Sequence, residues 1–192
     1  MRSGASVLDG RAAPEVLATY DEERRPSANA AIDFSMELGK VICVPDAAAA
    51  AARDNAMTAA YDGGISDVPG LPGIASGLIA AGAPLAGEVF PQGEIDGRWF
   101  DDLHGVGWRF VTVDADWTGL DRSLVGWLET IGGAVINVTS TAIDLFTWFE
   151  IQDVRWALQR PDFHLFGTAK DLDGATALLA ELRRQLRPTP SS

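Results

Sequence analysis

The C-terminal half of the chain alternates between apolar runs typical of strands and apolar residues repeated at helical spacing. Residues 108–113 are rich in β-forming side chains and predict a strand. Residues 120–131 place their large apolar side chains on one side of a helix, and residues 134–138 form a second short apolar strand between glycines and a polar segment. Residues 143–149 indicate a further short helix.

The last third of the chain continues this alternation. Residues 154–159 and 163–168 predict two strands, and the intervening Arg160, Pro161 and Asp162 suit a β-turn. Residues 171–186 predict a helix with a leucine-rich side. The resulting order, β-α-β-(α)-β-β-α, is that of the thioredoxin fold, an α/β fold in which both faces of the sheet are buried.

The N-terminal part predicts helices. Pro14 suits a first helical turn because its missing N–H would be unpaired there, and Pro26 predicts a kink or a restart. Beyond Pro26, apolar residues recur at three- and four-residue steps, which predicts one helix face: Ile32, Met36, Gly39 and Cys43. Cys43 is expected to pack there as a small core residue.

A second helix is predicted directly afterwards. Val44 and Pro45 end the first helix, and Asp46 can cap an alanine run of high helix propensity at 47–52. The segment from Tyr61 to Gly64 ends this second helix. We expect a long antiparallel helical hairpin whose apolar faces need a partner.

Composition divides the chain into three predicted parts. Residues 1–62 are alanine-rich and form the helical hairpin, residues 63–98 are a connector dense in glycine and proline, and residues 99–192 contain all six tryptophans and form the thioredoxin-like domain.

Charge and residue counts exclude several classes of function. The net charge of -12 disfavours nucleic acid and anionic membranes. No apolar run approaches the roughly 20 residues of a membrane span, and the first residues do not resemble a secretory signal, so we expect a cytoplasmic protein. Cys43 is the single cysteine, and His104 and His164 are the only histidines, which leaves too few ligands for a zinc site.

Three segments resemble the C-terminal region of FAD-dependent aromatic hydroxylases. Residues 20–26, YDEERRP, are similar to the Tyr-x-x-Glu-Arg-Arg-Pro helix that follows the last flavin-binding segment of that family. Residues 87–108 contain GEVFPQ and then WFDDLHGVGW, which are similar to the connector and first strand of the C-terminal domain. Residues 160–168, RPDFHLFGT, are similar to the family's Arg-Pro-Asp-aromatic hairpin. The resemblance fits the 3-(3-hydroxyphenyl)propionate hydroxylase type and runs from about Pro14 to Leu186.

The resemblance implies a thioredoxin-like domain without redox cysteines that contributes to subunit contacts. It also implies a parent oxidoreductase, a flavoprotein monooxygenase that uses FAD, NADH or NADPH, and O₂ to hydroxylate a phenolic ring. We expect a homo-oligomer such as a dimer, formed through the hairpin or the thioredoxin-like domain, and a flavin-binding region as a further partner.

The family's flavin-binding segments are not found in this sequence. There is no Gly-x-Gly-x-x-Gly after an opening strand, and no match is found to the family's segment around an Asp-Gly pair or to its Gly-Asp-Ala-Ala-His segment, both associated with flavin or NADPH binding. Gly105 and Gly107 precede a strand and are expected in a turn. We therefore assign no catalytic, cofactor-binding or metal residue, and expect the chain alone to bind no FAD and to catalyse nothing. Arg24 and Arg25 are expected to be exposed helix charges.

Two alternatives remain. One is a stand-alone thioredoxin-like interaction module. The other is a haloacid-dehalogenase-type phosphatase, because Asp114, Asp116 and Thr118 match its Asp-x-Asp-x-Thr opening, with Asp114 as nucleophile and Asp116 as general acid/base beside magnesium. Its downstream residues would be Lys170 with Asp171 and Asp173, yet little chain follows Thr118 for the required sheet and cap, so a polar loop is the simpler interpretation. Weaker candidates are Ser76, which misses a Gly-x-Ser-x-Gly elbow by one position, and Trp117, an aromatic residue in a predicted loop.

Overall fold

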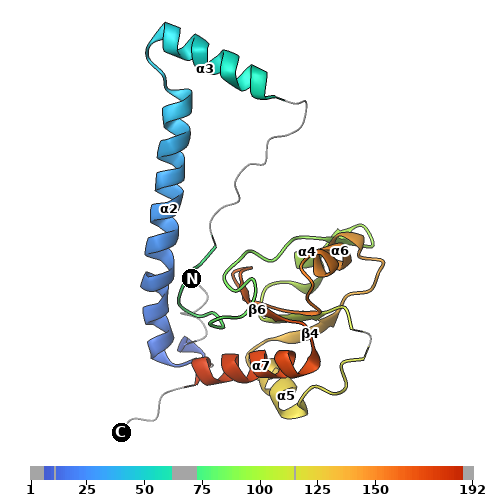
Figure 1. Ribbon diagram of the computed structural model, residues 1–192. Coiled ribbons are helices and arrows are strands. Elements are labelled where there is room, and N and C mark those ends of the chain that lie inside the picture. Colours follow the sequence, from blue (N-terminus) through green and yellow to red (C-terminus); the bar gives the residue numbers. More distant parts are fainter. Residues whose placement is uncertain (1–6, 11, 62–72, 115, 188–192) are drawn as a thin grey trace. The chain divides into compact units, whose positions relative to one another are not determined.

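The computed structural model describes residues 7–10, 12–61, 73–114 and 116–187 (Figure 1). The chain forms two compact units. The first contains the described residues up to Arg24 and those from Gly73 onward; the second begins at Arg25.

The first unit is built on a four-stranded sheet. The strands are β3 (Arg109–Thr112), β4 (Ala134–Asn137), β5 (Trp156–Gln159) and β6 (Leu165–Ala169), in the order β4-β3-β5-β6. Strands β3 and β4 are parallel, whereas β3–β5 and β5–β6 are antiparallel. This confirms the predicted α/β, thioredoxin-like topology, with strand boundaries within two residues of those expected.

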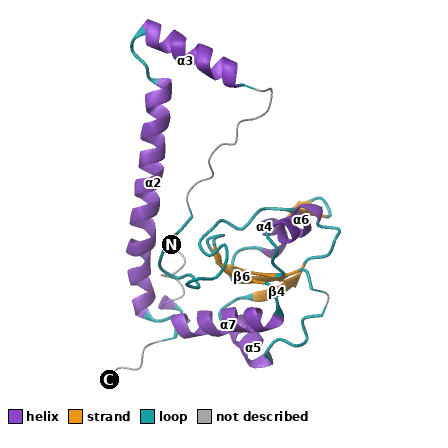
Figure 2. Cartoon of the chain, viewed as in Figure 1, coloured by secondary structure: helices purple, strands orange, loops and turns teal. Residues whose placement is uncertain are grey.

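Helices cover both faces of this sheet (Figure 2). On one face lie α5 (Arg122–Thr130) and α7 (Leu172–Leu186), and on the other lie α4 (Phe100–His104) and α6 (Ile143–Ile151). Alternate strand residues supply the two cores, because successive side chains of a strand point to opposite faces. In β5, Trp156 and Leu158 pack with α5 and α7, while Ala157 packs with α6.

The outer edge of β6 is closed by the glycine- and proline-rich connector. The amides of Ala80 and Gly87 donate to the carbonyls of Phe166 and Leu165 at 2.7 and 2.8 Å. At Gly87 the φ is +86°, and a Cβ would lie 1.8 Å from the carbonyl oxygen of Ile74, so only glycine fits. The connector therefore shields an edge that would otherwise present unpaired backbone groups.

A short hairpin precedes α4 and was not predicted. Its strands are β1 (Glu94–Ile95) and β2 (Arg98–Trp99), paired antiparallel. Two-residue strands are too short to produce the alternation by which a strand is identified in a sequence.

The N-terminal helices correct one expectation. Pro14 opens the 3₁₀ turn η1 (Pro14–Leu17) as expected. A kink or a restart was expected at Pro26, and α2 (Ala18–Ile42) continues through it as one helix, so there is no restart. Proline at 26 cannot donate to the carbonyl of Glu22. The hydroxyl of Ser76 donates to that carbonyl at 3.4 Å, so the connector supplies a partner that the helix lacks.

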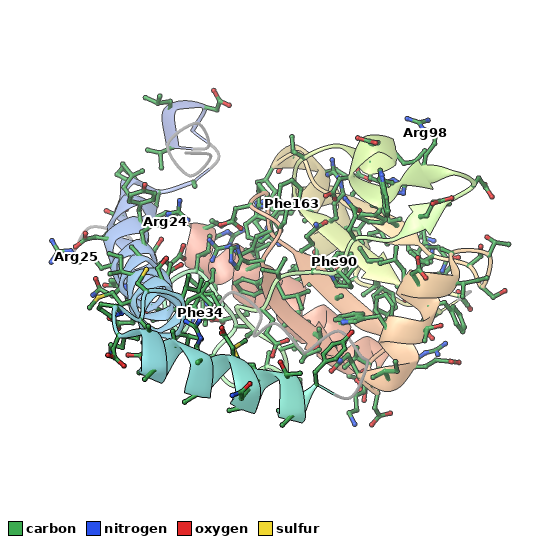
Figure 3. The ribbon with its side chains drawn as sticks, turned by 90° about the horizontal axis from the view of Figure 1, so that it is seen from above. Arg24, Arg25, Phe34, Phe90, Arg98 and Phe163 are labelled. Carbon is green, nitrogen blue, oxygen red and sulfur yellow. The ribbon has the colours of Figure 1, made fainter. Side chains whose placement is uncertain are left out.

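The second unit contains the rest of α2 and the helix α3 (Ala47–Ala60). Asp46 caps α3 as predicted, its carboxylate accepting from the amide of Ala49 at 2.7 Å. The corner is closed by Arg53, which donates to the carbonyls of Val41 and Ile42 at 2.5 and 3.2 Å. Beyond the corner α3 leaves α2 at a steep angle, so the two do not lie alongside each other as the expected antiparallel pair (Figures 1 and 3).

Cys43 lies at this corner and is exposed, so the prediction of a buried cysteine is wrong. The reason is that no other described part of this unit covers its helix face. Within the described ranges, no helix is long and apolar enough to cross a membrane.

Candidate functional site

The main polar cluster of the first unit is built around Glu23. Of the 25 residues of α2, all described, Glu23 is the single buried one, with 6% of its surface exposed. Its Oε1 accepts from the amide of Leu78 at 2.7 Å. Gly77 (φ +99°) lies directly against it, since a Cβ there would be 2.3 Å from the Glu23 Cγ. A carboxylate removed from water in this way needs a cationic partner.

That partner is Arg160, whose side chain is 5% exposed. Its Nη1 donates to Oε1 of Glu23 and to the carbonyl of Leu78, both at 2.9 Å. Nη2 donates to Oε2 of Glu23 at 2.8 Å and to Oδ2 of Asp162 at 2.9 Å, and Nε donates to Oδ1 of Asp162 at 3.1 Å. All five N–H groups of the guanidinium are thus used, and both carboxylates are bound in bidentate geometry.

The protonation states of the cluster are fixed by these contacts. Burial alone would lower the pKa of Arg160, but the bonds and charges of Glu23 and Asp162 outweigh it and raise that pKa. Burial would raise the pKa of Asp162, but the His164 hydrogen bond and the Arg160 charge hold it far below its ordinary value. These directions favour the charged forms of Arg160 and Asp162, and the guanidinium has no N–H left to donate to a ligand.

The cluster joins two of the three segments noted in the sequence. Glu23 is the second glutamate of YDEERRP, and Arg160 and Asp162 belong to RPDFHLFGT. Sequence reasoning placed these segments in a helix and a turn, and it missed their contact. Arg24 and Arg25 of the first segment are exposed, as predicted (Figure 3).

Asp114, the nucleophile of the phosphatase alternative, is engaged by two donors. Its Oδ1 accepts from Nε of Arg155 at 2.8 Å and its Oδ2 from Nε1 of Trp156 at 3.0 Å. The side chain of Asn137 also binds the backbone carbonyl of Asp114 at 2.6 Å. These contacts link the end of β3 to β4 and β5, which is a structural use of the carboxylate.

The other residues of that alternative do not gather around Asp114. Asp116 accepts from the amide and hydroxyl of Thr118 at 3.0 and 2.6 Å, and these bonds lower its pKa. Lys170 pairs with Asp153, and Asp171 caps α7 through the amide of Gly174 at 2.8 Å. Among the described residues, no group of three or more histidine, cysteine, aspartate or glutamate side chains could hold a metal ion.

The remaining candidates have structural positions. Ser76 donates to Glu22, and Gly105, with φ +63°, follows α4 as the expected turn residue. Trp117 packs partly buried against the core on the α5 face. It also lines an open hollow of about 360 Å³ with Arg122, Val125 and Glu129 among its neighbours.

The described βαβ unit does not carry the dinucleotide-binding pattern of glycines. The strand β3, helix α5 and strand β4 form a βαβ unit. The loop before α5 contains Asp114, Asp116 and Asp121 and has a single glycine, Gly119, where the dinucleotide-binding pattern has three. Asp121 instead caps α5, accepting from the amide of Ser123 at 2.7 Å. A carboxylate at the helix N-terminus repels a phosphate from the place where dinucleotides bind.

Comparison of the sequence with known proteins gives relatives of one kind, although no protein-family model matches the chain. It is 31% identical over 195 residues to the "Probable NADH-specific resorcinol 4-hydroxylase" of Rhodococcus jostii (strain RHA1), covering 92% of this chain and 36% of that protein. It is 29% identical over 196 residues to the "3-(3-hydroxy-phenyl)propionate/3-hydroxycinnamic acid hydroxylase" of Mycobacterium sp. (strain JLS), covering 91% of this chain and 30% of that protein. The chain thus spans about a third of the length of these relatives.

Solved structures share the fold. The flavin-dependent monooxygenase PieE, in complex with FAD and substrate, matches with a TM-score of 0.62 at 19% identity, covering 94% of this chain and 41% of that one. Aklavinone-11 hydroxylase, in a ternary complex with FAD and aklavinone, matches with a TM-score of 0.58 at 20% identity, covering 95% and 37%. The curated relatives show that the chain belongs to the aromatic-ring hydroxylases, of which it spans about a third, and the solved structures show that it shares its fold with flavin-dependent monooxygenases.

Proposed function

We propose that this chain serves as the C-terminal part of a flavin-dependent aromatic-ring monooxygenase that uses FAD, NADH or NADPH, and O₂ on a phenolic substrate. Its own role is structural: it supports assembly with the flavin-bearing region and between subunits, and it neither binds FAD nor catalyses a reaction alone. The relatives' printed names, which specify resorcinol and 3-hydroxyphenylpropionate hydroxylation, support the phenolic substrate class. We retain the division into 1–62, 63–98 and 99–192 as the proposed domain organisation.

The observation that carries the structural role is the apolar surface of α2 beyond Pro26. Ile32 and Met36 are 56% and 58% exposed, and they lie one turn apart on one side of the helix. Phe34 and Leu38, 36% and 48% exposed, are offset from them by two residues, or about 200° around the axis. The helix therefore has two apolar sides.

A helix that is apolar on more than one side is typical of a buried element. A single partner surface covers one side, so two sides require the helix to lie between surfaces. We propose that one surface belongs to the flavin-bearing region of the hydroxylase and the other to a second subunit. Ile42 at the corner and Met57 on α3 are further exposed apolar side chains of this unit.

Flavin binding gives a direct test of the first part. Titration of FAD with the purified chain should leave flavin fluorescence unquenched, and equilibrium dialysis should find no bound FAD. A full-length hydroxylase serves as the positive control. Uptake of one FAD per chain would overturn the proposal that this region binds no cofactor alone.

The assembly role is tested by light scattering after size exclusion. We expect the chain to self-associate as its concentration rises, because its exposed apolar helix has no other partner in solution. Ile32→Glu should shift the mass toward the monomer, whereas Asn29→Glu, a matched charge at an exposed position one turn earlier, should not. A strictly monomeric chain at all concentrations would contradict assembly through α2.

A further inference from the structure

Glu23 connects the start of α2 to the connector and to the turn after β5 of the thioredoxin-like unit. Glu23 is the only buried residue of α2, and Arg24 is the last residue of the helix that belongs to that unit. We propose that Glu23 and Arg160 form a latch: the ion pair holds residues 18–24 on the unit, and breaking it releases these residues while the sheet and its helices stay folded.

The latch holds only while Glu23 and Arg160 are both charged and paired. Glu23 and Arg160 are joined by bonds of 2.8 and 2.9 Å in a site where each side chain is less than a tenth exposed. Removing Arg160 leaves the Glu23 carboxylate buried without its counterion, which is strongly unfavourable, and Glu23 then moves toward water. Removing the Glu23 charge instead takes away the charge-assisted bonds that hold this turn of α2, while Arg160 remains paired with Asp162. For Glu23 the route to water is short, because its neighbours Glu22 and Arg24 are already exposed.

The connector is shaped to receive Glu23. Gly77 has no side chain where the Glu23 Cγ lies, and the Leu78 amide and carbonyl complete the coordination of the pair. Ser76 donates to the Glu22 carbonyl that Pro26 leaves without an intrahelical donor. Three successive connector residues thus contact one turn of α2, and two of them, Gly77 and Leu78, contact the Glu23 side chain itself.

Release is expected to be local because the flanking segments are anchored separately. Before α2, the amide of Ala13 donates to the Leu186 carbonyl at 3.1 Å, and Val16 is buried in the core on the α7 face. Arg160 keeps its bidentate bond to Asp162 when Glu23 is lost. Neither core contains a side chain of α2, so their packing does not require the latch.

Hydrogen exchange measured by mass spectrometry on the full chain tests this proposal. The variant Glu23→Gln keeps the side-chain shape and removes the charge; we expect peptides covering residues 18–24 to exchange at least about 100-fold faster. Peptides covering β5, β6 and α7 should change by less than a few-fold. Arg184→Met is the matched control, because Arg184 forms an exposed ion pair with Glu181 on α7 and should leave residues 18–24 protected.

A second variant keeps the test informative if Glu23→Gln folds poorly. Glu23→Met combined with Arg160→Met replaces the ion pair by apolar side chains of similar length, and such replacements preserve folding. In this double variant residues 18–24 should regain protection relative to Glu23→Gln. Equal loss of protection in residues 18–24 and in α7 would show that the pair supports the whole fold, and unchanged exchange in Glu23→Gln would show that it holds nothing; either result overturns the latch.

Discussion

At the scale of single residues, Gly77 gives the sharpest steric prediction. Its φ of +99° is disfavoured for any other residue, and a Cβ would overlap Glu23 at 2.3 Å. Gly82 has a similar φ of +78° but open space around it, so Gly82→Ala measures the backbone strain alone, about 1–2 kcal/mol. We expect Gly77→Ala to lower the free energy of unfolding by a further ~1–3 kcal/mol, the usual cost of overpacking. Urea unfolding of the two variants measures the difference; equal losses would refute the overlap.

His104 predicts a pH dependence. Burial, and then the charge of Arg109, lowers its pKa, and its ring packs on Phe100 with centroids 4.7 Å apart. The folded state therefore releases its proton more readily than the unfolded state, so the unfolded state binds more protons just below the ordinary pKa of about 6.5. Stability present above that pH should be lost as the pH falls through the lowered pKa.

The measurement is the unfolding free energy at pH 7.5 and at pH 5.5. The parent chain should lose stability between these values, and His104→Gln should lose less. His164→Gln removes the other histidine and should keep the full dependence that His104 causes. If His104→Gln loses as much stability between pH 7.5 and pH 5.5 as the parent chain, His104 is not the cause of the pH dependence.

Contacts between side chains that are far apart in the chain could not be predicted from the sequence. Glu23 and Arg160 are separated by 137 positions, and each stands in a segment whose other charges are exposed, so nothing local marks them as buried. Cys43 was misplaced for the converse reason, because apolar neighbours indicate burial only when another element covers them. Asp114 followed a strand as predicted, but its two donors, Arg155 and Trp156, come from a strand about 40 residues later.

At the scale of elements, helix caps were predictable and can be tested. Asp171 caps α7 through the Gly174 amide, and α7 packs on the sheet through five buried residues, among them Leu179 and Leu182. We expect Asp171→Ala to lower the free energy of unfolding by about 1 kcal/mol. Asp173→Ala, which removes a charge from the same first turn without removing a cap, should cost less. Thermal or urea unfolding would contradict the role of Asp171 if the two losses were equal.

The helices and strands that have strong local signals in the sequence were predicted correctly. Helix α7 has a leucine stripe and a capping aspartate, and β5 and β6 flank a proline-aspartate turn, so pattern and boundary signals agree there. Helix α2 does not restart at Pro26, and the Glu22 carbonyl that Pro26 leaves without a donor accepts from Ser76 of the connector, 54 residues after Glu22. A hydrogen bond from a residue this distant in the chain cannot be predicted from local helix propensity.

At the scale of the whole molecule, the two units differ in how they are stabilised. The first has two apolar cores, one on each face of its sheet. In the second, no residue from Arg25 to Tyr61 is buried. Isolated helices of fewer than about 12–15 residues are marginal in water, so the 14-residue α3 depends on a partner surface. Sequence composition suggested this contrast, since the alanine-rich segment lacks the tryptophans of the C-terminal part.

This contrast predicts where a protease cuts. Trypsin at low chain concentration should cleave first after Lys40 and Arg53, which lie in the second unit, and later after Arg183 and Arg184 in α7, which is packed on the sheet. At high chain concentration, cleavage after Lys40 should slow if a second copy covers the apolar sides of α2. Ile32→Glu should abolish that protection without changing the cleavage of α7. Early cleavage within α7 would contradict the difference in stabilisation between the two units. If cleavage after Lys40 does not depend on chain concentration, the chain does not self-associate through α2, and the flavin-bearing region is then the proposed partner that covers this helix.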